Sequence, residues 1–244
     1  MTKTPRMTHL IESNRRTITQ MLSGAEFKRL NNVNWLRHDI SYAEPRMLFH
    51  MPAKKQAPYL DFNCMTNIGF AYDYILANHN IGVIDEREIC GIHASLCMNT
   101  YISGGMYRTA NKLLEISVKH QRMSAPDAYE IPSRMSQIVA KINNARIPVL
   151  KRAFDAHYDI IALQPFDDFN KRTARLIMNW VLIRGGYRPI VFNKLADKEN
   201  YRMAIAQYAS GNPKGYYAYM SECLLRTQYQ IIKKLRQAKI YQNG

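Results

Sequence analysis

The sequence has no long apolar run, few cysteines and no low-complexity segment. No stretch approaches the roughly 18 apolar residues that a membrane-spanning helix needs, so we expect no membrane segment. The cysteines, Cys64, Cys90, Cys97 and Cys223, are too widely spaced for a paired metal knot and are predicted to be reduced core thiols. The first residues lack the apolar core of a signal peptide, which favours a cytoplasmic protein, or one delivered to a host cell without a cleavable signal.

Acidic residues are also scarce, with 19 Asp and Glu against 34 Lys and Arg, which gives a net charge of +15. Such a charge attracts polyanions, nucleotides or acidic proteins through long-range fields. The alternative is a basic surface that only keeps the protein in solution. Because the chain has no zinc-finger spacing, RNP-type aromatic strand or long basic arm, nucleic-acid binding is the last of the functions that we consider.

The chain is 244 residues long and 47% hydrophobic, enough to bury one substantial core. No repeat and no Ser/Gly-rich or Pro-rich linker divides it, so we predict a single domain over residues 1–244. The fold class is predicted to be mainly α, a helical bundle, because apolar residues recur at three- and four-residue spacing. The expected helices are Met7–Leu22, Met65–Asn78, Glu86–Met98, Ser133–Asn144, Pro148–Ala162, Asn170–Gly185, Tyr201–Ala209 and Lys214–Lys239.

Local signals place several boundaries of these helices. Asp85 and Ser133 stand where N-caps belong, and the pair Gly185-Gly186 stands where a helix should end. Three prolines within Glu44–Leu60 predict a long connecting loop.

One segment departs from the helical pattern. Residues 107–132 combine short β-leaning runs with a Ser-Ala-Pro-Asp turn, which predicts a small β-hairpin standing off the helical body. Such a flap can hold an extended segment by strand pairing. An ordinary surface hairpin is the alternative.

The densest cluster of charge lies in the stretch LQPFDDFNKRTAR. A turn that leads into a helix at Asn170 presents unpaired N–H groups and the positive end of the helix dipole, which suit an anion. Arg172 and Arg175 are one helical turn apart, so we expect them to lie side by side and grip separate phosphate oxygens. Asp168 supplies an oxygen ligand suited to Mg²⁺. Together these features indicate a nucleotide polyphosphate with magnesium, and helix capping beside a solvated basic face is the alternative.

This stretch resembles the signature of the Fic (filamentation-induced-by-cAMP) family, His-x-Phe-x-Asp/Glu-Gly-Asn-Gly-Arg-x-x-Arg. Over residues 164–175 its positions are taken by Gln164, Phe166, Asp168, Phe169, Asn170, Lys171, Arg172 and Arg175. The run GGMYRTAN, Gly104–Asn111, is similar to the family's lead into its flap, and RLIMNWVLIRGGYRPIVF, Arg175–Phe192, to its usual continuation. The similarity extends from about Thr8 to Arg226 and implies the Fic fold.

Fic proteins typically transfer AMP from ATP to a hydroxyl of a target protein. The resemblance therefore implies a protein adenylyltransferase lineage that uses ATP, or another nucleotide, with Mg²⁺, and docks its target on the flap. It implies that Asp168 binds the metal and that Asn170 and Arg172 hold phosphates. It further implies that Phe166 packs under the loop and that Arg175 reaches the outer phosphate.

Gln164 departs from the family at the catalytic position, where the motif has its proton-accepting His. A carboxamide does not titrate near neutral pH, so it cannot deprotonate a target hydroxyl. Its presence, natural or deliberate, should slow transfer by roughly 10²–10⁴ without preventing nucleotide binding. A pseudoenzyme that binds nucleotide or a protein partner is therefore an alternative. His157 lies about 10 Å of helix rise from Gln164, so we expect a satisfied buried histidine and not a substitute base; His120, in the flap, is expected at the surface.

Two further departures concern the glycines of the motif. Phe169 replaces the first, where a bulky side chain is costly if the backbone needs a positive φ. Lys171 replaces the second and resembles the Doc branch of the family, which is associated with phosphate transfer. A Doc-like phosphotransferase is therefore a further alternative, and Phe169 and Lys171 join the nucleotide-binding candidates.

The first helix resembles the inhibitory helix of some Fic proteins. MTHLIESNRRTIT matches the pattern Ser/Thr-x-x-x-Glu-Gly/Asn at Thr8 and Glu12 but has Ser13 at the last position. The resemblance implies that residues 1–24 act as a brake in which Glu12 pairs with Arg175 and takes the place of the outer phosphate. In the last helix, residues 214–239, the run GYYAYM serves either the core, which we expect, or an interface between two copies.

Overall fold

The computed structural model describes residues 3–23, 58–118, 121–192 and 197–242. Its helices are α1 (Lys3–Ser23), α3 (Pro58–Ala77), α4 (Glu86–Leu96), α5 (Ile131–Asn143), α6 (Val149–Leu163), α7 (Asn170–Arg184), α8 (Asp197–Ala209) and α9 (Pro213–Gln242). The prediction of a mainly α fold is confirmed. Within the described ranges, no helix is both long enough and apolar enough to span a membrane.

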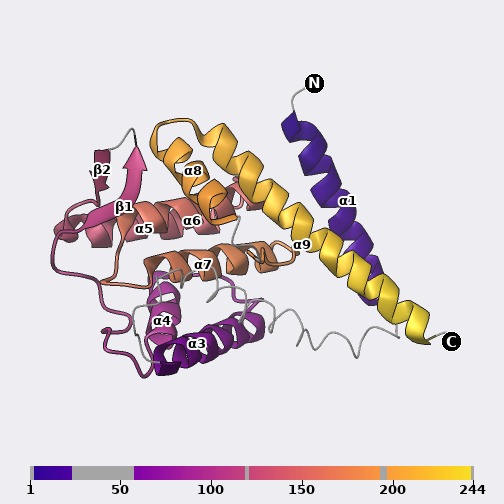
Figure 1. Ribbon diagram of the computed structural model, residues 1–244, viewed down its shortest axis with the longest axis horizontal. Coiled ribbons are helices and arrows are strands. Elements are labelled where there is room, and N and C mark those ends of the chain that lie inside the picture. The colour runs from indigo at the N-terminus through magenta and orange to yellow at the C-terminus, as the bar shows by residue number, and fades with distance from the viewer. Residues whose placement is uncertain (1–2, 24–57, 119–120, 193–196, 243–244) are drawn as a thin grey trace.

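Helix α7 lies in the middle of the molecule (Figure 1), with α5 and α6 on one side and α3 and α4 on the other. It is buried on nearly all sides, and Trp180 and Leu182 have no exposed surface. A helix buried all round belongs to the centre of a core and not to its surface. The surrounding helices therefore fix the start of α7, where the motif lies, by packing.

The strands β1 (Leu113–Val118) and β2 (Gln121–Ser124) form an antiparallel pair within the segment 107–132. Leu113 lies opposite Ser124 and Val118 opposite Gln121. A backbone hydrogen bond of 3.0 Å from Ala125 N–H to Lys112 O closes the base of the hairpin. His120 lies outside the described residues.

Two of the predicted helix boundaries are confirmed. Asp85 caps α4, and its carboxylate accepts a hydrogen bond from Glu88 N–H at 2.9 Å. Helix α7 ends at Arg184, followed by Gly185 and by Gly186 at φ +77°, a backbone conformation that favours glycine.

Two other boundaries were predicted wrongly. Ser133 is not an N-cap, because the 3₁₀ turn η2 (Ala128–Glu130) runs directly into α5 and Pro132 occupies its first turn. The connecting loop expected over Glu44–Leu60 lies outside the described residues up to 57, but its last three residues are helical. Helix α3 begins at Pro58, since the missing N–H of a proline costs nothing at a helix start.

Helix α1 packs along α9 (Figure 1). Ile11 and Ile18 are buried in this contact, and Ile18 forms a small second cluster with Ile231, Ile232 and Leu235. Gln228 Nε2 donates a hydrogen bond of 3.2 Å to Ile11 O. Helix α1 is therefore part of the packed body.

One tyrosine of the last helix and the described cysteines lie in or near the core. Tyr216 of the GYYAYM run has no exposed surface, as the core interpretation predicts. Cys97 and Cys223 are buried free thiols and Cys90 is a half-buried one, whereas the side chain of Cys64 lies outside the described part.

Candidate functional site

The turn between α6 and α7 is bounded by two residues in the left-handed backbone conformation. Gln164, the C-cap of α6, has φ +48°, and Phe169, the N-cap of α7, has φ +55°. Both are uncommon for residues other than glycine and cost on the order of 1–2 kcal/mol each. The surrounding contacts must therefore hold this turn in place.

Asn170 supplies part of that support from inside the turn. Its Oδ1 accepts from Phe166 N–H at 2.9 Å, and its Nδ2 donates to Phe166 O at 2.7 Å and to Gln164 Oε1 at 3.2 Å. Asn170 is buried, with 3% of its surface exposed. Its side chain therefore connects both ends of the turn between α6 and α7, residues 164–169, which we call the motif loop. This role comes in addition to the contact with phosphate that the sequence predicts.

Gln164 is held within the same network. Its Nε2 donates to Ile161 O at 2.9 Å while its Oε1 accepts from Asn170, and only 9% of the residue is exposed. Both polar atoms of the carboxamide thus have partners, one in the last turn of α6 and one in the first turn of α7. A group in this position can orient the loop but has no proton-accepting nitrogen to offer a substrate.

His93 of α4 supports the loop from below, a role that the sequence did not suggest. Its ring stacks on Phe166 with centroids 3.8 Å apart and an interplanar angle of 3°. Because Nδ1 accepts from Gly105 N–H at 2.9 Å, the proton is on Nε2, which lies 3.1 Å from Asp168 O. Burial lowers the pKa of His93 to about 4, so the ring is neutral at neutral pH.

Arg108 is the second unforeseen support, since the sequence indicated it only as part of the lead into the flap. Its Nε donates to Gln164 O at 2.6 Å, and its Nη2 donates to Leu163 O at 3.3 Å and to Pro126 O at 2.6 Å. Its Nη1 donates to Ala110 O at 2.7 Å, and the residue is 3% exposed. This guanidinium therefore joins the end of α6 to the base of the hairpin.

The entrance of α7 brings together three of the predicted charged residues. Asp168 is exposed just before the helix, and Lys171 and Arg172 are half-buried in its first turn. The guanidinium of Arg172 lies over the ring of Phe169, 4.1 Å from its centroid. Phe169 therefore occupies the motif's glycine position as a stacking platform for Arg172.

Arg175 is not part of this cluster. It is 4% exposed, and its guanidinium lies against the rings of Phe192 and Tyr201, 4.8 Å and 4.7 Å from their centroids. The expectation that Arg172 and Arg175 lie side by side at a phosphate is not met in this arrangement. Phe192 and Tyr201, which follow α7 in the chain, contact the guanidinium of Arg175. Of these two arginines, only Arg172 lies at the start of α7.

His157 is a satisfied core histidine, as expected. Its Nδ1 lies 2.7 Å from the hydroxyl of Tyr216, which donates to Phe154 O, so Nδ1 carries the proton. Tyr201 donates to Nε2 at 2.9 Å. Burial, together with the charge of Arg175, holds the pKa of His157 well below its usual value.

Glu12 has partners other than the predicted one. Its carboxylate accepts from Arg15 Nε at 2.9 Å, one turn along α1, and from the hydroxyl of Tyr187. Tyr187 lies beyond the C-terminal end of α7, whereas Arg175 lies in its second turn. These contacts replace the expected pair between Glu12 and Arg175.

Restoring glycine at position 169 is expected to destabilise the protein. Phe169→Gly relieves about 1–2 kcal/mol of backbone strain, but it removes about 1.5–3 kcal/mol of side-chain burial and a further 0.5–1 kcal/mol of cation–π attraction. We expect a net loss of about 1–2 kcal/mol in urea unfolding, against little change for Tyr129→Gly at an exposed site. A more stable glycine variant would show that the strain outweighs the packing.

Comparisons with known proteins agree with this geometry. A family model described as Fic/DOC family matches residues 83–182. A protein adenylyltransferase Fic from Nematostella vectensis is 33% identical over 72 residues, which cover 30% of this chain and 17% of that protein. One from Drosophila melanogaster is 32% identical over 72 residues, which cover 30% of this chain and 14% of the relative. The chain therefore spans only a small part of these relatives.

Solved structures share the fold over nearly the whole chain. A Fic domain containing signalling protein from Bacteroides thetaiotaomicron has a TM-score of 0.79 at 22% identity, with 95% of this chain and 97% of that one covered. Fic-1 from C. elegans has a TM-score of 0.76 at 17% identity, with 94% and 71% covered. The N-terminal Fic domain of a putative cell filamentation protein from Bartonella quintana, with bound ADP, has a TM-score of 0.52 at 17% identity, with 70% and 87% covered.

Proposed function

We propose that the chain, whose residues 83–182 match the Fic/DOC family model, is an adenylyltransferase-type protein that binds a nucleotide at the start of α7 and, with Gln164 in place, transfers AMP to protein hydroxyls only slowly or not at all. The observation behind this is Gln164, whose carboxamide is hydrogen-bonded within the loop at the position where the family motif has its base. The absent base lowers the expected rate by roughly 10²–10⁴.

The residues at the entrance fit part of a magnesium nucleotide. The exposed carboxylate of Asp168 can serve as a single protein ligand to Mg²⁺, which would neutralise phosphate charge when bound. The first-turn N–H groups of α7, with Lys171 and Arg172, can receive the inner phosphates. Arg175 does not fit the outer phosphate where it lies, because its guanidinium is stacked in the core. For Arg175 to hold the outer phosphate, it has to leave Phe192 and Tyr201.

The hydroxyl donor is proposed to be a protein that docks against the hairpin segment 107–132. Leu113, at the start of β1, and Tyr129, in η2 after the hairpin, are 59% and 82% exposed. Two solved structures of similar fold are described as IbpAFic2 covalently tethered to Cdc42 and as a variant in complex with adenylylated Cdc42. Both support a protein target for the present chain, without identifying it.

The brake proposed for α1 has to be tested separately from the base. Glu12 contacts Tyr187 and Arg15, so removing its carboxylate is expected to have little effect on transfer unless α1 shifts towards Arg175 when nucleotide binds. The Gln164→His experiment described next is therefore made both with Glu12 and with Glu12→Gly.

Replacing Gln164 by His is expected to raise the transfer rate by about 10²–10⁴. The measurement is incorporation of label from ATP marked in its α-phosphate into the protein itself or into lysate proteins. Gln164→Asn, which keeps a carboxamide, is the matched control and should stay at the level of the unaltered chain. Label appearing only from the γ-phosphate would identify a Doc-like phosphotransferase instead. If Gln164→His binds Mg-ATP yet neither label is transferred, the chain is a nucleotide-binding pseudoenzyme.

A further inference from the structure

The two arginines near the start of α7 are held by different aromatic side chains. The guanidinium of Arg172 lies over Phe169, 4.1 Å from its ring centroid. That of Arg175 lies 4.8 Å from the ring centroid of Phe192 and 4.7 Å from that of Tyr201, and only 4% of Arg175 is exposed. The first guanidinium therefore stays at the entrance of the helix, whereas the second is kept inside the protein.

Phe192 and Tyr201, which we call the aromatic box, are fixed by the core. Their exposed fractions are 0% and 4%, and their ring centroids lie 5.6 Å apart at an interplanar angle of 71°. The hydroxyl of Tyr201 donates to Nε2 of His157 at 2.9 Å. Because burial lowers the pKa of His157, its ring is neutral and adds no positive charge that would expel Arg175.

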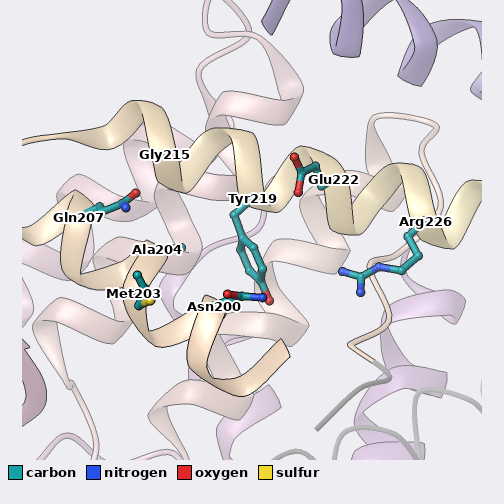
Figure 2. Close-up of a pocket in the computed structure, with 8 residues that line it drawn as sticks. All are labelled: Asn200, Met203, Ala204, Gln207, Gly215, Tyr219, Glu222 and Arg226. Carbon is teal, nitrogen blue, oxygen red and sulfur yellow. The ribbon is translucent and has the colours of Figure 1, made fainter. Parts of the chain in front are cut away.

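Helix α8 brings Tyr201 to the aromatic box, and the packing of α8 on α9 holds it there. The ring of Tyr201 lies 6.4 Å from that of Tyr219 on α9. Figure 2 shows the side chain of Tyr219 extending to Asn200, the residue before Tyr201, where both line the groove between α8 and α9. Tyr201 therefore cannot leave Arg175 without disturbing the contact between two helices, so the guanidinium is the part that can move.

Release of Arg175 has a cost that depends on the ligand. A buried guanidinium that leaves two aromatic rings loses its cation–π attraction to both. A ligand that needs this guanidinium binds with an apparent affinity reduced by the fraction of molecules in which Arg175 has left the aromatic box. A ligand held only by the first turn of α7 has no such cost.

We propose that the aromatic box is a specificity determinant that makes the site prefer a nucleoside diphosphate to a triphosphate. The inference rests on the proposed nucleotide site, in which Lys171, Arg172 and the first N–H groups of α7 receive the inner phosphates. The third phosphate of a triphosphate either stays without Arg175 or has to draw it from the aromatic box. In both cases it adds little to the affinity, so the diphosphate should bind at least as tightly.

Calorimetry of the full chain with Mg-ADP and with Mg-ATP measures the ratio of the two dissociation constants. In the unaltered chain, ADP is expected to bind at least as tightly as ATP. Phe192→Leu removes one ring and should raise the affinity for ATP about threefold to tenfold, while the affinity for ADP changes by less than about twofold. Adding Arg175→Ala to Phe192→Leu should cancel this gain, because the gain depends on the released guanidinium.

Two further positions separate the ring contact from a general loss of packing. Tyr201→Leu should shift the ratio in the same direction as Phe192→Leu, whereas Tyr201→Phe keeps the ring and should leave the ratio unchanged. Phe154→Leu removes a ring that is 2% exposed and lies beside Tyr217. It should lower stability without changing the ratio.

The proposal is overturned if ATP binds the unaltered chain more tightly than ADP, or if Phe192→Leu and Tyr201→Leu leave the ratio where it was. It is also overturned if Phe154→Leu shifts the ratio as much as these variants do. The proposed nucleotide site fails separately, if neither nucleotide binds or if ADP binding survives Arg172→Ala. Thermal melts show that each variant is folded before its affinities are compared, and Tyr201→Leu keeps the test decisive if Phe192→Leu does not fold.

Discussion

Replacing Arg108 by alanine is expected to lower the free energy of unfolding by on the order of 3–5 kcal/mol. The guanidinium donates to the carbonyls of Leu163, Gln164, Ala110 and Pro126 in a site that is 3% exposed. Alanine would leave these acceptors without their donor, and each buried unsatisfied group costs about 1–3 kcal/mol. For a chain of this size the melting temperature should fall by roughly 6–20 °C.

The test compares urea unfolding of Arg108→Ala and Arg108→Lys with that of Arg134→Ala. Lysine keeps the charge but lacks the planar fork, so it should recover only a minor part of the loss. Arg134 pairs with Glu130 on the surface, where such a pair contributes little, and its removal should cost under about 1 kcal/mol. Equal effects at Arg108 and Arg134 would mean that Arg108 does not hold the loop.

Stability is expected to fall steeply as the pH drops below about 6.5. Burial lowers the pKa of His93 to about 4 and that of His157 well below its usual value. In the unfolded chain both rings bind a proton near pH 6.5, whereas in the folded protein they stay neutral. The unfolded state therefore binds more protons in this range, and acid favours it.

For His93 the loss between pH 6.5 and pH 4 is on the order of 3 kcal/mol, since one proton contributes about 1.4 kcal/mol per pH unit. Urea midpoints measured from pH 7.5 to pH 4 give the slope. His93→Gln keeps a donor and an acceptor without titrating, so its slope should be shallower by about one proton. His79→Gln, at an exposed site, should leave the slope unchanged, and an unchanged slope in His93→Gln would contradict a neutral buried ring.

The sequence predicted the helices because apolar periodicity and local capping decide them, as at Asp85 and Gly186. It also placed Lys171 and Arg172 in the first turn of α7, as the structure has them; anion binding at this helix start stays a prediction. The N-cap predicted at Ser133 was wrong because the chain is already helical at that point. The 3₁₀ turn η2 continues directly into α5, and Pro132 lies in the first turn of α5.

The site residues that the sequence missed act over long separations. Arg108 donates hydrogen bonds to the carbonyls of residues 163 and 164, and His93 donates one to the carbonyl of residue 168. No local sequence pattern predicts contacts over such separations. Spacing alone places Arg172 and Arg175 on adjacent parts of α7, but it does not reveal that Phe192 and Tyr201 will bind the second guanidinium. The position of the Arg175 guanidinium depends on which aromatic residues of the later chain pack against α7.

The packing of α1 has a consequence for how Glu12 could exert control. Ile11 and Ile18 are buried against α9, and Ile11 O accepts a hydrogen bond from Gln228, so lifting α1 away would uncover both clusters. Undocking of the whole helix is therefore too costly to serve as a routine switch. If Glu12 regulates the site, it must do so by exchanging its hydrogen-bond partners, Tyr187 and Arg15, while α1 stays packed on α9. Side-chain rotamer changes take picoseconds to nanoseconds, so the exchange of partners itself would not limit how fast Glu12 responds.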